Sequence, residues 1–252
     1  MPHFLVTNDD GVEAPGLLAL AQGLRDLGEV TVFAPNHNWS VAGHSKTMHK
    51  PLRVWSVILE DGSTAMSTDG APSDCVALAA LGLVLQPIDV VVSGINTTPN
   101  LGFDVTYSGT VAAAMEAAIS GWPGIALSLD SGEGERHWRT AAEVAVVVTG
   151  MVLEQGLAAG TLLNVNVPDV PFGQLRGYRA TRLGHRVYRD VLIERSDPRG
   201  VPYYWIGGEP PTGLQEEGTD LEAISHGYVS VTPLHMDMTQ HRLLDSIRRW
   251  LA

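Results

Sequence analysis

The chain has 252 residues, 44% of them hydrophobic and 17% charged, which is enough to bury a sizeable core and argues against disorder. Its formal net charge of −12 would repel a phosphate backbone at long range, so we expect no nucleic-acid polymer as a partner. The longest apolar stretch, residues 76–85, is much shorter than the ~20 residues that span a bilayer, so we expect no membrane span. The single cysteine, Cys75, fits a reducing compartment, so we expect a cytoplasmic location.

Short apolar runs alternate with helix-forming segments through the first two-thirds of the chain. Such runs are typical of strands that are buried in a parallel sheet. The predicted strands are residues 4–7, 30–34, 90–93, 125–129 and 162–167. Residues 15–28 begin with Pro and end with Gly, which predicts a helix between the first two strands. The pattern indicates an α/β core with a right-handed crossover.

After Pro168 the composition changes to short segments in which tyrosines and tryptophan alternate with Arg, Gly and Pro. This pattern predicts strands and hairpins over residues 175–210, followed by a strand at 228–232 and a short amphipathic helix at 240–251. We therefore divide the chain into a core, residues 1–174, and a strand-rich extension, residues 175–252, within one structural domain. Exposed strand-rich arms often pair across a subunit boundary, so we expect a homo-oligomer.

Two adjacent carboxylates, Asp9 and Asp10, directly follow the first predicted strand. Two like charges about 4 Å apart repel by roughly 4 kcal/mol at an effective dielectric near 20, so a chain that keeps them together in a cleft usually binds a cation there. The alternative is a solvated turn, because Asp-Asp-Gly is also ordinary turn chemistry.

Three loops should meet beyond the carboxyl ends of the parallel strands, where ligands of open α/β sheets bind. They are residues 8–11, 35–45 and 94–102, and all three supply glycines and small oxygen donors. Oxygen donors suit Mg²⁺ or Mn²⁺. Zinc is disfavoured because neither HExxH nor paired CxxC occurs, and His37, His44 and His49 are interpreted as loop or supporting residues.

The segment Ser108-Gly109-Thr110 immediately precedes a strongly helix-forming run, residues 111–118. Free N–H groups and hydroxyls at a helix start can hold a phosphate, although Ser108 or Thr110 can equally be a plain N-cap. The motifs GxSxG, GxxxxGK[ST] and, after the first strand, GxGxxG are missing, which argues against serine hydrolases, P-loop ATPases and dinucleotide enzymes.

These segments together resemble the SurE survival-protein family of metal-dependent 5'-nucleotidases. The matching segments are TNDDG at 7–11, APG at 14–16, GHS at 43–45, VSGIN at 92–96, YSGTVAAAME at 107–116, LNVNVP at 163–168, YYWIGG at 203–208 and GTD at 218–220. The resemblance spans nearly the whole chain. It implies a Rossmann-like three-layer core with a mostly parallel sheet, hydrolysis of nucleoside 5'-monophosphates, and a homodimer or homotetramer assembled partly through the C-terminal region.

The resemblance also implies the site residues. Those that match the family's metal ligands, for one divalent cation per subunit (Mg²⁺ or Mn²⁺, with Co²⁺ possible), are Asp9, Asp10, Ser40 and Asn96. Those expected to contact phosphate are Asn96, Ser108, Gly109 and Thr110. The chain departs from the family's usual residues at Asn36, His37, Val41, Thr98 and Phe103. The departures alter charge and backbone freedom at the rim of the cleft.

We expect Asp9 and Asp10 to be the catalytic carboxylates, with the cation polarising a phosphate oxygen and orienting water for in-line attack. A rival mechanism makes Asp9 the nucleophile through an aspartyl-phosphate. Two other functions stay open on the sequence alone: a metal-dependent nucleotide sensor without turnover, and a metal-dependent glycosyltransferase.

Overall fold

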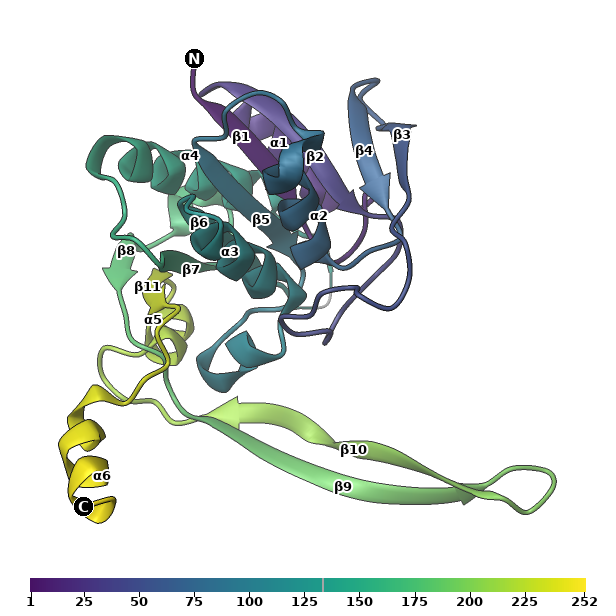
Figure 1. Cartoon of the computed structure of the whole chain (residues 1–252), viewed down its shortest axis with the longest axis vertical. Coiled ribbons are helices and arrows are strands. Elements are labelled where there is room, and N and C mark those ends of the chain that lie inside the picture. Colours follow the sequence, from purple (N-terminus) through teal and green to yellow (C-terminus); the bar gives the residue numbers. More distant parts are fainter. Residues whose placement is uncertain (133) are drawn as a thin grey trace.

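The computed structural model describes residues 1–132 and 134–252. Within this part of the chain, nine strands form one sheet in the order β3-β4-β2-β1-β5-β6-β7-β11-β8, while β9 and β10 pair only with each other. Helices cover both faces of the sheet (Figure 1). The predicted three-layer α/β fold with a mostly parallel sheet and a strand-rich C-terminal part is confirmed.

The strands are β1 (His3–Thr7), β2 (Glu29–Pro35), β3 (Val54–Ile58), β4 (Thr64–Thr68), β5 (Val90–Asn96), β6 (Gly124–Asp130), β7 (Thr161–Pro168), β8 (Tyr178–Ala180), β9 (Arg186–Ser196), β10 (Pro202–Gly213) and β11 (Val229–His235). The helices are α1 (Pro15–Leu24), α2 (Pro72–Leu78), α3 (Gly109–Ile119), α4 (Trp138–Gln155), α5 (Asp220–Ser225) and α6 (Leu244–Trp250). All five strands predicted for the core are present.

The centre of the sheet is buried on both faces, which explains why its strands are continuous apolar runs. In β1 every residue is buried. Phe4 and Val6 pack with α1 and α4 on one face, whereas Leu5 packs with α2 and α3 on the other. Alternate residues of a strand point to opposite faces, so a two-sided core requires apolar residues at every position.

Helix α1 ends at Leu24, earlier than the predicted end at residue 28. The chain needs the intervening turn because Gly28 passes against the N-terminus, where a Cβ would lie 2.2 Å from the carbonyl oxygen of Pro2. The next residue, Glu29, then donates its backbone N–H to the same oxygen at 2.9 Å and begins β2.

Both edges of the sheet contain elements outside the parallel core. The hairpin of β3 and β4, which the sequence did not reveal, extends the β2 edge, and β11 and β8 extend the β7 edge. The strand predicted at residues 228–232 therefore belongs to the central sheet and pairs antiparallel with β7. The division of the chain at residue 174 stays a prediction.

Strands β9 and β10 form an antiparallel hairpin that projects away from the rest of the molecule (Figure 1). We call residues 186–213 the arm. The predicted C-terminal helix is present as a short 3₁₀ turn, His241–Leu243, followed by α6. Among the described residues, no helix is long and apolar enough to cross a membrane.

Candidate functional site

The candidate site lies beyond the carboxyl ends of three neighbouring strands. Strand β1 pairs in parallel with β2 on one side and β5 on the other. The loops that follow these strands therefore emerge at the same edge of the sheet. Asp9 and Ser40 lie in the loops after β1 and β2, and Asn96 is the last residue of β5, at the edge where the sequence predicts ligand binding in an open sheet.

A pocket of about 280 Å³ opens at this edge. Its lining includes four of the predicted site residues, namely Asp9, Ser40, Asn96 and Ser108. The rest of the lining is Val41, Thr97, Thr98, Pro99, Asn100, Asp104 and Tyr107. Asp10, Gly109 and Thr110 do not line this pocket. Gly109 and Thr110 contact Asp9, which does line it.

Asp9 is buried, with 3% of its surface exposed, and the start of α3 holds its carboxylate. The Thr110 hydroxyl donates to Asp9 Oδ1 at 2.5 Å, and the Thr110 backbone N–H donates to Oδ2 at 3.0 Å. Gly109 permits this approach, since a Cβ there would lie 2.8 Å from the Cβ of Asp9. Burial raises the pKa of Asp9, while the bonds from Thr110 act in the opposite direction.

Asp10 is half-buried and lies beside the loop that follows β2. Asn38 Nδ2 donates to Asp10 Oδ1 at 3.3 Å, and Asn38 Oδ1 accepts from the Ser40 backbone N–H at 2.7 Å. Burial, and then the charge of Asp9, raise the pKa of Asp10 to about 6, with Arg136 opposing them. Asn38 thus joins the acidic turn to Ser40, a role that the sequence analysis did not assign.

Asn96 and Ser108, which also line the pocket, each keep a group that is free to bind a ligand. Asn96 Nδ2 donates to the Thr98 carbonyl at 2.7 Å, which fixes the amide and leaves its Oδ1 as an acceptor. Ser108 is the N-cap of α3, and its Oγ accepts from the Val111 N–H at 3.1 Å. The hydroxyl proton of Ser108 stays available for an anion.

The donor set fits a hard divalent cation. No group of three or more His, Cys, Asp or Glu side chains in residues 1–132 and 134–252 is arranged to hold a metal ion. A metal here would therefore depend on the Ser40 hydroxyl and the Asn96 amide in addition to the carboxylates. Such mixed oxygen ligands suit Mg²⁺ or Mn²⁺. A positive charge would offset the burial that raises the pKa of Asp9, and the burial and repulsion that raise the pKa of Asp10.

The loop after β5 owes its shape to a buried amide network that the sequence analysis missed. The Asn100 N–H donates to Asn166 Oδ1 at 2.7 Å, and the Asn100 carbonyl accepts from Asn164 Nδ2 at 2.8 Å. Asn100 Nδ2 also donates to Ser128 Oγ at 2.8 Å. The polar residues within the apolar run of β7 are the only local sign of this network, because buried amides require partners.

Two of the residues that depart from the family pattern, Val41 and Thr98, line the pocket. Val41 has a φ of 63°, which is rare for a β-branched residue. Thr98 lines the pocket, and Phe103 packs edge-on against His185 with ring centroids 5.8 Å apart. His37 Nδ1 lies 2.6 Å from Asn36 Oδ1, so these two side chains contact each other.

Comparison with known proteins gives a consistent result. A family model described as "Survival protein SurE" matches residues 4–190. The "5'-nucleotidase SurE" of Chloroflexus aggregans is 54% identical over 98% of each chain, and that of Herpetosiphon aurantiacus is 51% identical over 98% of this chain and 96% of its own. The crystal structure of the SurE protein from Aquifex aeolicus covers 100% of both chains with a TM-score of 0.86 and 42% identity.

Proposed function

We propose, given that this chain belongs to the SurE family of survival proteins and is a 5'-nucleotidase, that it hydrolyses nucleoside 5'-monophosphates to nucleoside and phosphate with one divalent cation per subunit. The observation that carries the proposal is a single pocket lined by Asp9, Ser40, Asn96 and the helix start at Ser108. Metal-binding oxygens and a phosphate-binding helix start adjoin there, which is the combination that phosphoryl transfer requires.

The residues proposed to hold the cation are Asp9, Asp10, Ser40 and Asn96. When bound, the cation would polarise a phosphate oxygen and lower the pKa of a bound water. The Ser108 hydroxyl and the N–H groups at the start of α3 would bind the remaining phosphate oxygens. Thr110 would hold the Asp9 carboxylate in its orientation toward the cation through its two hydrogen bonds.

Water is the proposed nucleophile, although Asp9 is the rival. Both carboxylate oxygens of Asp9 accept a hydrogen bond from Thr110, which makes each oxygen a weaker nucleophile than a free carboxylate oxygen. Label in the Asp9 carboxylate after a single turnover in heavy-oxygen water would establish the rival and defeat direct attack by water. The configuration at phosphorus, in a substrate whose phosphate is made chiral with oxygen isotopes, separates the two routes in full: direct attack by water inverts it, whereas attack by Asp9 followed by water retains it.

The deciding experiment measures phosphate release from a panel of nucleotides. The chelated protein is supplied with Mg²⁺, Mn²⁺ or Co²⁺, and Asp9→Asn is the control. We expect release only with added metal and a loss of roughly 10³-fold in kcat for Asp9→Asn, because the site relies on charge. Nucleotide binding without release above the Asp9→Asn control would indicate a sensor, and sugar transfer would indicate a glycosyltransferase.

We also propose that the protein is a homodimer or homotetramer and that the arm pairs with a second copy. Trp205 and Ile206 on β10 are 62% and 83% exposed. An isolated two-stranded ribbon cannot bury its own apolar side chains, so another chain must cover them. A cytoplasmic location, expected from the single cysteine, is part of the same proposal.

A further inference from the structure

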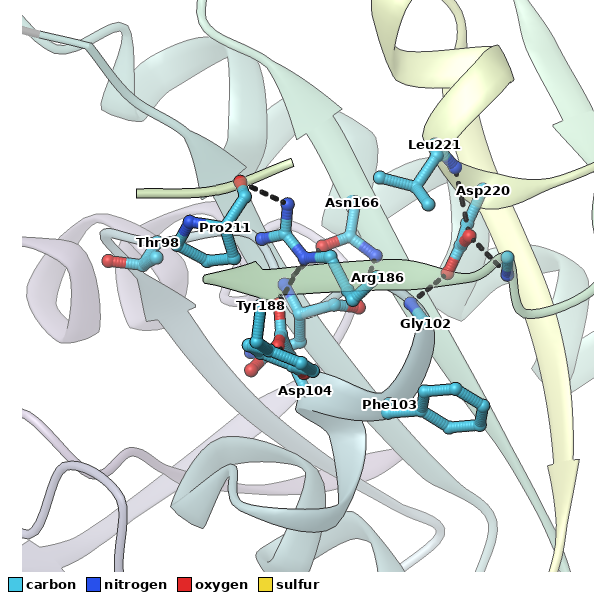
Figure 2. Close-up of polar contacts among 12 residues, drawn as sticks. Thr98, Gly102, Phe103, Asp104, Asn166, Arg186, Tyr188, Pro211, Asp220 and Leu221 are labelled. Atoms are coloured by element: carbon cyan, nitrogen blue, oxygen red, sulfur yellow. Dashed lines mark hydrogen bonds and ion pairs between the residues drawn. The ribbon is translucent and has the colours of Figure 1, made fainter. Parts of the chain in front are cut away.

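The rim of the pocket is joined to the base of the arm. A short 3₁₀ turn, Gly102–Thr106, forms this rim and contributes Asp104 to the pocket lining. Arg186 Nε donates to Asp104 Oδ2 at 2.6 Å, and the Tyr188 hydroxyl donates to Asp104 Oδ1 at 2.6 Å. Both side chains come from the first residues of β9 (Figure 2). Both oxygens of the Asp104 carboxylate are therefore bound by the arm.

The ion pair between Arg186 and Asp104 is largely shielded from water. Only 11% of the Arg186 side chain and 21% of the Asp104 side chain are exposed. A charge-assisted hydrogen bond in such surroundings is stronger than a surface ion pair. Arg186 also donates to the Pro211 carbonyl at 3.3 Å, so the same guanidinium joins both strands of the arm to the pocket rim.

A second group of contacts fixes the same rim. Asp220 accepts from the backbone N–H of Gly102 and from that of Gly184, each at 2.8 Å (Figure 2). Gly102 has a φ of 53°, and a Cβ there would lie 2.5 Å from the Gly184 carbonyl oxygen. Phe103 packs edge-on against His185. The rim turn and the segment that enters the arm thus have little freedom to move independently.

We infer that Arg186 and Tyr188 are positioning residues of the nucleotidase: they set the orientation of Asp104 and its rim turn, and thereby link the arm to the part of the pocket that receives the nucleoside. The metal and phosphate ends of the site depend on Asp9, Ser40, Asn96 and Ser108, which the arm does not contact through any hydrogen bond among the described residues. The inference rests on the proposed nucleotide substrate.

The test compares a nucleoside 5'-monophosphate with glycerol 2-phosphate, which has no nucleoside. For Arg186→Met we expect KM for the nucleotide to rise about tenfold, because the variant loses one charge-assisted hydrogen bond to Asp104. We expect kcat to stay within about twofold of wild type. Catalytic efficiency for glycerol 2-phosphate should change less than about threefold. Tyr188→Phe removes one hydroxyl and should show a smaller shift of the same kind. It also keeps the test valid if Arg186→Met folds poorly.

Arg189→Met is the matched control. Arg189 lies on the same strand, but its guanidinium contacts Thr212 at 3.1 Å and Glu209 at 3.9 Å, both within the arm. It should leave both substrates unchanged. Equal losses for both substrates in Arg186→Met, or wild-type kinetics in Arg186→Met and Tyr188→Phe together, would overturn the inference.

A double variant separates position from charge. Arg186→Met leaves the Asp104 carboxylate uncompensated, and this charge alone could repel an anionic substrate. If Arg186 positions the rim, Arg186→Met combined with Asp104→Asn keeps the raised KM for the nucleotide. Restoration of the wild-type KM in the double variant would show that only charge matters, and the inference would fail. Failure of the proposed function is distinguishable, because wild-type protein would then release no phosphate from either substrate.

Discussion

At the scale of single residues, the hydrogen bonds to Asp9 separate its position from its charge. Burial makes an ionised Asp9 costly in the absence of a cation, yet Thr110 holds both of its carboxylate oxygens in place. A side chain that is fixed before the cation binds loses little conformational entropy when it becomes a ligand. Thr110 therefore sets the orientation of the Asp9 carboxylate in advance.

Removal of the Thr110 hydroxyl should lower activity more than stability. Thr110→Val keeps the shape of the side chain but leaves Asp9 Oδ1 without its 2.5 Å hydrogen bond. We expect kcat/KM to fall about tenfold to a hundredfold, since hydrogen bonds to charged groups contribute about 1.5–3 kcal/mol. Steady-state kinetics at saturating metal measure this.

Thr149→Val is the control for Thr110→Val. The Thr149 hydroxyl is buried and has no hydrogen-bond partner among the residues that the structure describes. Its loss should leave kcat/KM unchanged. Equal activity of Thr110→Val and wild type would mean that Asp9 does not depend on this bond.

Val41 is a strained residue at the pocket mouth. It is a β-branched side chain with a φ of 63°, and it is exposed, so packing does not compensate the strain. Val41→Gly should raise the free energy of unfolding by about 1 kcal/mol, because the relief of about 1–3 kcal/mol of strain exceeds the added entropy of the unfolded chain. Denaturant unfolding measures the change. Val201→Gly, an exposed valine without a positive φ, should instead lower stability, and a loss of stability in both variants would contradict this account.

At the scale of elements, Glu116 connects helix α3 to the loop after β2. Its carboxylate lies 3.0 Å from His44 Nε2 and 2.6 Å from Lys46 Nζ, although the helix buries nearly the whole side chain. The hydrogen bond with His44, together with Lys46, lowers the pKa of Glu116 below its ordinary value of 4.5. The loop that carries Ser40 is thus tied to the helix that begins at Ser108.

This pairing predicts a specific pH dependence. A carboxyl group whose pKa is lowered on folding stabilises the protein above its unfolded pKa, and this contribution disappears as the pH falls through the folded value. Glu116→Gln should therefore cost about 1–3 kcal/mol near pH 7 and much less near pH 3. Unfolding curves at both pH values check this. The control is Glu143→Gln, which removes a surface ion pair with Arg139 and should change stability by less than about 0.5 kcal/mol. A loss of stability in Glu116→Gln that is the same at both pH values would contradict the assignment.

At the scale of the whole molecule, the base of the arm is held by the rest of the chain, but Trp205 and Ile206 farther along it are exposed in the monomer. Replacement of Trp205 and Ile206 by Ser should convert the proposed oligomer to monomer, because burial of these side chains contributes about 1.5–3 kcal/mol each at every copy of the interface. Light scattering during size-exclusion chromatography measures the mass. Arg195→Ser, on the neighbouring strand, should keep the oligomer, and a wild-type protein that is monomeric at all concentrations would refute the proposal.

Much of the fold could be predicted from the sequence. The five core strands are legible because a strand that is buried on both faces must be an unbroken apolar run. The hairpin of β3 and β4 was missed although β3 is an apolar run broken only by Ser56. It lies at the sheet edge, where most of β3 is exposed, and its partner strand β4 is mostly polar, so no second apolar run marks the hairpin. The argument that parallel strands direct their loops to one edge predicted which loops meet, and Asp9, Ser40 and Asn96, which the resemblance selected in those loops, line one pocket. Their roles as metal ligands stay a prediction.

The sequence by itself determined the order of strands and helices and the kinds of oxygen donor in each loop, since both are written in local patterns of a few residues. Only the tertiary structure decided that Thr110 holds Asp9, that Asn38 joins Asp10 to Ser40, and that Arg186 reaches Asp104 from 82 positions away. Such contacts depend on side-chain directions after the sheet has closed and twisted. Local propensity does not specify those directions, because the energy that selects them comes from packing and hydrogen bonding between distant segments.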